Sequence, residues 1–318
     1  MRAVRGFVVV VITAGALLAC TGDPVGEAPS DTGVAVDGTV TDGTDVGSDS
    51  PVDSSVRDGD GGTSTETATG DVADGAGEGG RGDATVIDSG ACGVHPGPPM
   101  IQLSTGTVSF CIDTTEVTNA QYDEFLDDAA HPPVMPDYCG FDTDRGSKVT
   151  DGALAKRPVT SINFCDALAY CRWAGKRLCG KIGGGATPIA SYASAAVSEW
   201  SFACENGAAA TAYPYGASFV DGTCATAGPE AASSLVDVGS KSGCHGATGA
   251  FTSLFDLSGN AAELEDACSS YDVATPPGSR ACQVRGGFVG GSTFDCAANH
   301  TADMDASYDV TGFRCCAD

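Results

Sequence analysis

Apolar and polar positions along the chain predict a few short helices followed by short strands. Alternating residues at 100–103 and 108–112 flank a Ser-Thr-Gly turn, a pattern typical of a β-hairpin. Beyond Gly207 the chain has short runs divided by Gly and Asp, and no long segment with a helical period. The pattern therefore predicts an α+β domain in which much of the chain is loop.

The first predicted helix follows Thr118. Thr118 can cap the helix, and Gln121, three residues later, can bond back to complete a capping box. Val117 and Tyr122 occupy the two positions of a hydrophobic staple. The apolar residues at helical spacing, which predict its buried face, are Tyr122, Phe125, Leu126 and Ala129.

Two further helices are predicted before residue 207. One begins after Asn163, whose side chain is a good cap, and runs through Trp173 to an end at Gly175. The other covers residues 193–204. Its apolar residues at helical spacing are Val197, Trp200 and either Ala203 or Cys204.

The first twenty residues have the pattern of an exported bacterial lipoprotein. Two arginines precede an apolar segment over residues 6–18, which is too short to span a bilayer comfortably. Cys20 directly follows Leu-Leu-Ala, and a cysteine at this place is the one that becomes lipidated. We predict a signal peptide over residues 1–19 and a lipid anchor on Cys20, which would hold the protein in the cell envelope, at the outer membrane or cell surface. The alternative is an ordinary signal peptide and a secreted protein.

Residues 20–90 are predicted to form a disordered acidic tether. Residues 21–90 contain sixteen acidic and two basic residues, and no Phe, Tyr, Trp or Cys. Such a segment, rich in Asp, Gly, Thr and Ser, cannot bury enough apolar surface to offset the conformational entropy of folding. Residues 91–318 are numerous enough to form one domain with a core of its own.

The acidic balance of the chain restricts its partners. Residues 91–318 carry twenty-six acidic and twelve basic residues, a net charge of −14. This charge argues against nucleic acid and against an anionic lipid surface as partners. A protein, peptide or glycan ligand remains as the expected partner, together with the membrane through the lipid anchor.

Fourteen of the fifteen cysteines lie beyond residue 91. In an exported chain this even number predicts up to seven disulfides. A zinc site is the competing interpretation, but the chain has no Cys-x-x-Cys. Its four histidines are dispersed along the sequence, at His95, His131, His245 and His300.

Eight short motifs follow one another in the folded part. They are Glu-Val-Thr-Asn-Ala-Gln-Tyr at 116–122, Arg-Pro-Val at 157–159, the helical segment 166–178, Glu-Trp at 199–200, Tyr-Pro-Tyr-Gly at 213–216, Leu-Ser-Gly-Asn-Ala-Ala-Glu at 257–263, Arg-Gly-Gly at 285–287 and Gly-Phe-Arg-Cys at 312–315. From residue 100 to 318 this order resembles the formylglycine-generating enzyme, or sulfatase-modifying factor, family. The resemblance implies a variant of the C-type-lectin-like fold with little regular secondary structure.

The resemblance also locates the place where catalysis would occur. The family's copper oxidases, which convert a sulfatase cysteine to formylglycine, carry a serine and two cysteines after Arg-Gly-Gly. The matching positions here are Phe288, Gly291 and Cys296. Two soft thiolates suit Cu(I), and one of them is replaced by glycine. Copper is therefore not expected, and Cys296 is the one candidate catalytic residue, with Gly291 at its expected partner position.

A calcium loop of the family is matched by residues 256–263. The carboxylates of Asp256 and Glu263 flank a Gly-Asn turn, and the backbone carbonyls of Gly259 and Ala261 can complete an oxygen shell. A structural calcium ion is therefore predicted here. The alternative is a plain turn with two solvated acids.

Two other features follow from the resemblance. Ala262 and Leu264 stand where related domains usually carry tryptophans, which reduces the aromatic packing expected near a substrate groove. A disulfide is implied between Cys171 and Cys315. By closing a long loop it would contribute about 4 to 5 kcal/mol in the chain-entropy model.

The sequence thus predicts an exported, lipid-anchored protein whose domain binds a ligand at the cell surface or assists the maturation of another exported protein. The alternative is a metal-dependent oxidase of the family. Such an enzyme would convert a sulfatase cysteine to formylglycine, or oxidise another thiol, through a rearranged sulfur pair that includes Cys296.

Overall fold

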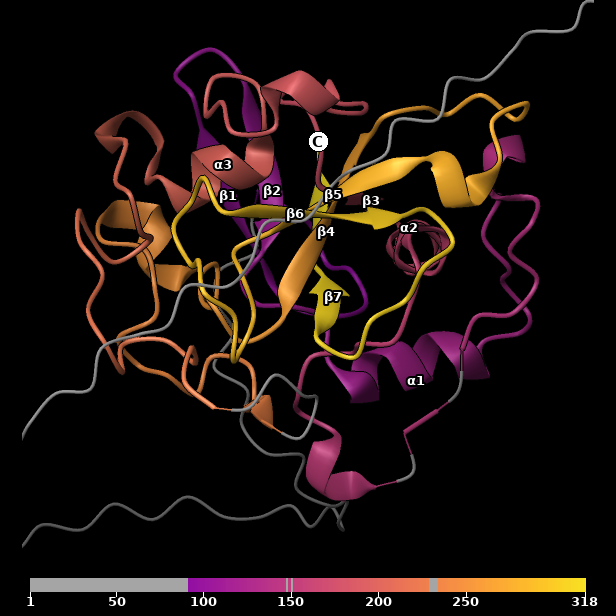
Figure 1. The fold of residues 1–318 in the computed structure, drawn as a ribbon, viewed down its shortest axis with the longest axis horizontal. Coiled ribbons are helices and arrows are strands. Elements are labelled where there is room, and N and C mark those ends of the chain that lie inside the picture. Colours follow the sequence, from indigo (N-terminus) through magenta and orange to yellow (C-terminus); the bar gives the residue numbers. More distant parts are fainter. Residues whose placement is uncertain (1–90, 147, 150, 229–233) are drawn as a thin grey trace, which may run out of the picture. The chain divides into compact units, whose positions relative to one another are not determined.

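The computed structural model describes residues 91–318 except 147, 150 and 229–233. The predicted signal peptide, the lipidation site at Cys20 and the tether lie outside the described residues. Figure 1 shows short elements joined by long loops. The elements are β1 (Met100–Ser104), β2 (Ser109–Asp113), α1 (Asn119–Asp127), α2 (Phe164–Trp173), β3 (Arg177–Leu178), α3 (Glu199–Cys204), β4 (Ala262–Cys268), β5 (Ala281–Arg285), β6 (Asn299–Asp303), β7 (Thr311–Phe313) and β8 (Cys315–Ala317).

Short 3-10 helices occur in the loops. They are η1 (Asp137–Cys139), η2 (Gly152–Leu154), η3 (Ile189–Ser191), η4 (Gly207–Ala209), η6 (Gly249–Ser253) and η7 (Pro277–Ser279). No helix in the part of the chain that the structure describes is long and apolar enough to cross a membrane.

Two four-stranded sheets form the framework. One has the order β1-β2-β8-β3, in which every neighbouring pair is antiparallel. The other has the order β6-β5-β4-β7, in which β4 runs parallel to β7 and antiparallel to β5. Only Arg314 separates β7 from β8, so the C-terminal segment passes from one sheet to the other at this residue. The predicted α+β class is confirmed.

Local sequence determines where α1 and α2 begin. The Thr118 side chain accepts a hydrogen bond from the Gln121 backbone N–H, and the Gln121 side chain accepts one from the Thr118 N–H, as the capping-box prediction requires. Asn163 caps α2 in the same way, with Asp166 as its partner. Gly175, with φ at 69°, follows α2 and supplies the left-handed conformation that helix ends favour.

Two local predictions were wrong. The third helix was predicted from residue 193, but α3 begins at Glu199, because the Ser198 side chain caps it by accepting from the Ser201 N–H. The segment before Ser198 forms turns instead. Ala129 was assigned to the buried face of the first helix, but α1 ends at Asp127 and Ala129 is exposed.

The core has two main parts, one on each side of the central strands. In Figure 1, α1 and α2 lie on one side of β4 and β7, and α3 lies with β1 and β2 on the other. The larger cluster packs apolar residues of α1 and α2 against those of β4, β5 and β7. The second cluster joins α3 to β1 and β2.

Seven disulfides link all fourteen cysteines of residues 92–316. Neighbouring cysteines at the C-terminus have separate partners: Cys315 is bonded to Cys171 of α2, the pair that the resemblance implies, and Cys316 is bonded to Cys179. The other bonds are Cys92–Cys111, Cys139–Cys165, Cys204–Cys296, Cys224–Cys244 and Cys268–Cys282. This outcome agrees with the prediction of a disulfide-rich domain.

Candidate functional site

Arg285, at the end of β5, organises the loop that contains the candidate catalytic cysteine. Its guanidinium is fully buried and forms an ion pair with Glu265 at 3.0 Å. It also donates to the backbone oxygens of Tyr192 and Cys296, at 2.6 and 2.7 Å, and lies over the ring of Trp200 at 4.6 Å. The loop after β5 is thereby tied to β4 and α3.

The two glycines after Arg285 make this loop geometrically possible. Gly286 and Gly287 have φ values of 81° and 71°, in the left-handed region that favours glycine. A Cβ atom at Gly287 would lie 2.0 Å from the backbone oxygen of Thr293. The Arg-Gly-Gly motif therefore has a backbone role that is independent of any chemistry in the loop.

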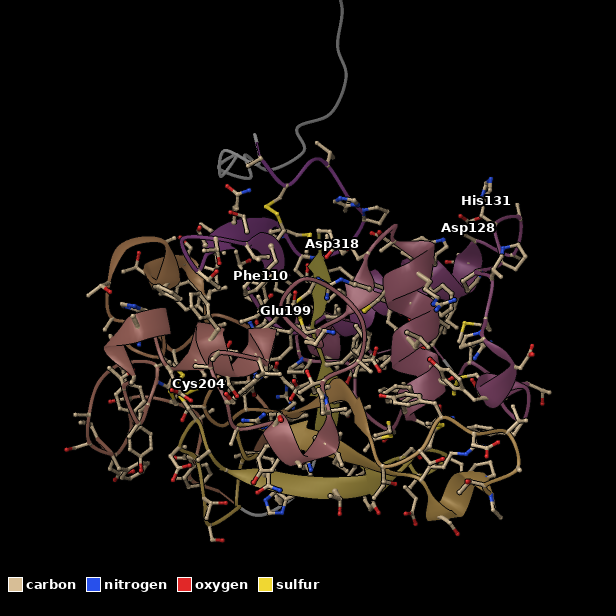
Figure 2. All side chains as sticks on the ribbon, turned by 90° about the horizontal axis from the view of Figure 1, so that it is seen from above. Phe110, Asp128, His131, Glu199, Cys204 and Asp318 are labelled. Atoms are coloured by element: carbon tan, nitrogen blue, oxygen red, sulfur yellow. A yellow bond between two sulfur atoms is a disulfide. The ribbon has the colours of Figure 1, made fainter. Side chains whose placement is uncertain are left out.

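The sulfur of Cys296 is bonded to Cys204 at 2.03 Å. Cys204 ends α3, as Figure 2 shows, and both cysteines are buried. A sulfur in a disulfide cannot act as a thiolate nucleophile or metal ligand until the bond is reduced. In this state Cys296 is a structural link between α3 and the loop after β5.

The other two positions of the family's reactive set contain no sulfur or hydroxyl. Phe288 is half-buried, and its ring lies 5.5 Å from that of His300. Gly291 donates its backbone N–H to the Phe288 oxygen at 2.9 Å. A cavity of about 260 Å³ lies beside Phe288, between sheet β6-β5-β4-β7 and the segment 308–310.

The predicted calcium loop lies in a buried polar cluster. The Glu263 carboxylate accepts two hydrogen bonds of 2.6 Å from the Arg314 guanidinium and one of 2.8 Å from the Trp200 indole. All three side chains are buried. Glu263 therefore has a fixed positive partner, and it is not the solvated acid of the alternative interpretation.

Glu116 and Asp256 complete this cluster and carry oxygens without partners. Asp256 accepts from the Gly239 N–H at 2.6 Å through one oxygen, and the Ala261 N–H approaches Glu116 at 3.4 Å. The second oxygen of each carboxyl group is buried and accepts from no N–H or O–H group within the described ranges. When one of the two groups is protonated, they hydrogen-bond to each other.

Burial, more than any neighbouring charge, sets the charge state of these two groups. Burial, in the first place, raises the pKa of Asp256 to about 6. The pKa of Glu116 is raised well above its ordinary value by burial and then by the negative charges of Asp256 and Glu263. One guanidinium, that of Arg314, thus faces three carboxyl groups.

When both groups are ionised, the free oxygens of Glu116 and Asp256 fit a hard cation by their chemistry. Calcium prefers carboxylate and carbonyl oxygens, and a divalent ion would offset the excess negative charge. The oxygens of Glu116, Asp256 and Glu263 do not all come within 4.8 Å of one another in the described part of the chain. The side-chain donors that fit are therefore Asp256 and Glu116, while Glu263 is bound by Arg314.

In a different group of three residues, the possible metal-ligand atoms do lie within 4.8 Å of one another. These residues are Cys179, Glu199 and Cys316. The two sulfurs are bonded to each other at 2.01 Å, and the Glu199 carboxylate is bound by Arg177 through two hydrogen bonds of 2.5 Å. This group is a structural cluster with no donors left for a metal.

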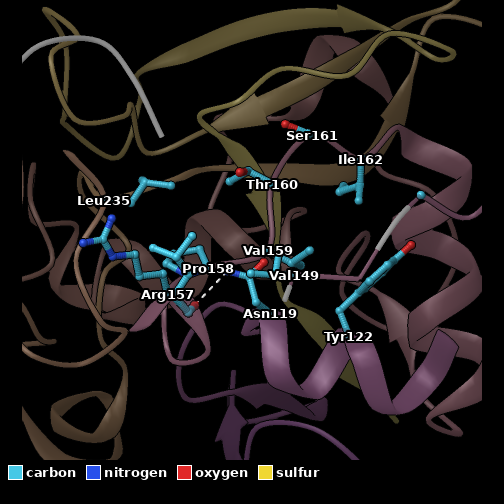
Figure 3. Close-up of a pocket in the computed structure, with 12 residues that line it drawn as sticks. Asn119, Tyr122, Val149, Arg157, Pro158, Val159, Thr160, Ser161, Ile162 and Leu235 are labelled. Atoms are coloured by element: carbon cyan, nitrogen blue, oxygen red, sulfur yellow. Dashed lines mark hydrogen bonds between the residues drawn. The ribbon is translucent and has the colours of Figure 1, made fainter. Parts of the chain in front are cut away.

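A larger cavity, of about 420 Å³, lies near the start of α1 (Figure 3). The side chains of Tyr122, Ile162 and Leu235 border it, and the Asn119 N–H donates to the Arg157 oxygen at its edge. Its wall passes through residues 146 and 149, next to positions outside the described residues. This cavity therefore carries no ligand assignment.

Comparison with known families decides the identity of the domain. The family model described as "Sulfatase-modifying factor enzyme 1-like domain" (FGE-sulfatase) matches residues 72–318. The chain belongs to this family. No curated protein sequence matches it.

Three solved structures resemble this FGE-sulfatase domain at low identity. PvdO from Pseudomonas aeruginosa is 17% identical, with a TM-score of 0.42, over 66% of this chain and 80% of its own. CarF is 16% identical, with a TM-score of 0.43, over 66% of this chain and 86% of its own. Treponema denticola variable protein 1 is 17% identical, with a TM-score of 0.37, over 66% of this chain and 84% of its own.

Sequence reasoning missed two residues that shape the sites of this FGE-sulfatase domain. Glu116 stands about 140 positions before Asp256 in the sequence, yet the fold places it in the same cluster. Cys204 was counted on a helix face, not as the partner of Cys296. The signal that could have found Glu116 is its place as the first residue of the Glu-Val-Thr-Asn-Ala-Gln-Tyr motif at 116–122.

Arg314→Met should destabilise the domain by about 3 to 5 kcal/mol at pH 7.5, because three buried carboxyl groups would lose their positive partner. The loss should be smaller at pH 5. Since the folded-state pKa values of Glu116 and Asp256 are raised, their protonated forms favour folding at low pH. This contribution is lost as the pH rises through the folded-state pKa of each group, which for Asp256 is about 6.

Denaturant unfolding under oxidising conditions, at both pH values, measures this effect. Arg314→Lys is the matched control, because it keeps the positive charge but cannot form the bidentate hydrogen bonds to Glu263. It should lose less stability than the Met variant. If the Met variant fails to fold at pH 7.5, the refolded fraction at pH 5 and 7.5 replaces the unfolding curve. Equal stability of the Met variant and the unmodified protein at pH 7.5 would contradict the account.

Proposed function

We propose that this is an exported, lipid-anchored member of the FGE-sulfatase family whose domain binds a protein, peptide or glycan, or assists the maturation of another exported protein, without oxidising a cysteine. One observation carries the proposal. The sulfur of Cys296 is bonded to Cys204, while Phe288 and Gly291 occupy the remaining reactive positions.

Burial weighs against the alternative of a thiol oxidase with a rearranged sulfur pair. Reduction of the Cys204–Cys296 bond would give two thiols, but Cys204 is fully buried and Cys296 is 2% exposed. Arg285 holds the backbone of Cys296 against α3, so a substrate thiol would have to displace this packing to reach the pair. A bound ligand needs no such displacement.

Export is supported by the cysteines of the domain. Seven disulfides form and persist in oxidising compartments and are rare in the cytosol. With the signal pattern of residues 1–19 and Cys20, they favour a place in the cell envelope. The acidic residues 20–90 would then hold the domain away from the membrane.

Calcium is the cofactor proposed for this domain. Asp256 and Glu116 would supply carboxylate oxygens, and the backbone oxygens of Gly259 and Ala261 would complete the shell, beside Glu263 in its pair with Arg314. The ion would stabilise the loop between η6 and β4. Its role there would be structural, because none of these four donor residues lines the cavity at Phe288.

In the presence of oxygen, the protein loaded with Cu(I) should form no formylglycine in a cysteine-containing peptide and should oxidise its thiol no faster than the same amount of Cu(I) alone. Oxygen uptake and the mass of the peptide measure the reaction. The control is the double variant Cys204→Ser/Cys296→Ser, and a second control, Cys92→Ser/Cys111→Ser, loses a disulfide elsewhere. Turnover that survives in the second control and vanishes in the first would establish the oxidase and refute the proposal.

Calcium at about 100-fold above its dissociation constant should raise the melting temperature by roughly 5 to 10 °C, since binding to the folded state alone contributes about 2.7 kcal/mol. Asp256→Asn and Glu116→Gln should abolish the increase. Asp237→Asn, at an exposed acid in the neighbouring loop, should retain it. An identical melting curve with chelator and with calcium would count against the site.

A further inference from the structure

The cavity beside Phe288 has walls of distinct chemical character. Its floor is one face of sheet β6-β5-β4-β7, because the strand partners Ala262 with Thr311 and Val284 with His300 all border it. The alanine and valine side chains make this floor small and apolar. The remaining lining residues are Phe288, Thr301, Ala302, Tyr308, Asp309 and Val310.

Two aromatic residues stand over this floor. Phe288 lies on the loop after β5, and Tyr308, which is 49% exposed, lies on the segment that leads into β7. Aromatic faces attract ammonium and guanidinium groups through the ring quadrupole, most strongly where water is partly excluded. Rings beside an apolar floor suit a ligand with a methylene stem and a cationic head.

The charge at the rim has the same preference. Asp309 lines the cavity, is exposed and forms no ion pair with any described residue. Asp303 and Asp305 are exposed and lie a few residues before Asp309 in the sequence. No Lys or Arg lines the cavity, and His300 is its one basic lining residue. An anionic ligand would be repelled here, and a neutral apolar ligand would gain nothing from Asp309.

The volume limits the occupant to a single side chain. About 260 Å³ lies below the usual range of sites for complete small-molecule ligands. The cavity opens beside β6, an edge strand whose outer side has no strand partner within the described residues. A segment of a partner polypeptide can therefore approach this edge and insert one residue.

We infer that this cavity binds the basic side chain, arginine or lysine, of a partner polypeptide. The stem packs on the apolar floor, and the cationic head lies between the aromatic rings and Asp309. The inference rests on the proposed function, since it names the chemistry of the ligand that the domain binds in place of a substrate cysteine.

Titration of the isotope-labelled full chain with small probes, followed by NMR, tests this inference. The probes are Nα-acetyl-arginine amide, Nα-acetyl-lysine amide and the uncharged Nα-acetyl-norleucine amide, which has a similar stem. The cationic probes should shift signals of residues around Phe288 and Tyr308. They should bind at least tenfold more tightly than norleucine amide.

Three variants assign the binding to the cavity. Asp309→Asn should weaken the binding of the cationic probes about tenfold and leave the affinity for norleucine amide within twofold. Tyr308→Leu keeps an apolar side chain without a ring face, and should weaken the arginine probe several-fold. Asp305→Asn is the matched control. It removes the same charge at a position four residues before Asp309 that does not line this cavity. It should leave the affinity of every probe within twofold.

Norleucine amide binding as tightly as the cationic probes, no effect of Asp309→Asn, or an equal effect of Asp305→Asn would each overturn the inference. The copper and peptide assay described above, run on the same preparation, separates this failure from that of the proposed function. If the cationic probes do not bind and no thiol turnover is seen, only the inference of a basic side chain in the cavity is rejected. Thiol turnover rejects the proposed function itself.

Discussion

Two buried arginines, each bound to a glutamate on one face of β4, connect the parts of this domain. Glu263 and Glu265 alternate with Leu264 along the strand, so the carboxylates share one face while the leucine packs into the larger core. Arg314 binds Glu263 and Arg285 binds Glu265, all at or near full burial. A buried charge that loses its partner destabilises a fold strongly, so each of these pairs constrains everything attached to it.

What is attached to them explains the layout of the molecule. Arg314 stands where the chain passes from one sheet to the other, and it also binds the backbone oxygens of Asp113 and Phe255. Arg285 holds the loop that ends at Cys296. The family motifs that contain these arginines are therefore required by the architecture, and their presence says little about catalysis. Function has to be argued from the residues between the two arginines. There Phe288 and Gly291 carry no hydroxyl or thiol, and the sulfur of Cys296 is bonded to Cys204.

Local features of the fold were predictable, and long-range ones were not. The caps at Thr118 and Asn163 depend on residues three positions apart, so the sequence alone reveals them. The start of α3 was missed because the apolar spacing continues upstream of Ser198, where a side-chain cap takes precedence. The meeting of Glu116 with Asp256 depends on how distant segments pack, for which a single sequence contains no direct signal.

The central claim is that the sulfur at the family's reactive position serves as a structural link. The most direct test is disulfide mapping of the full-length protein isolated without a reducing agent, with free thiols alkylated under denaturing conditions before digestion without reduction. The account predicts one linked pair of peptides that contains Cys204 and Cys296, and no alkylated Cys296. Quantitative alkylation of both cysteines would contradict it, because two reduced sulfurs would then be available for metal and thiol chemistry.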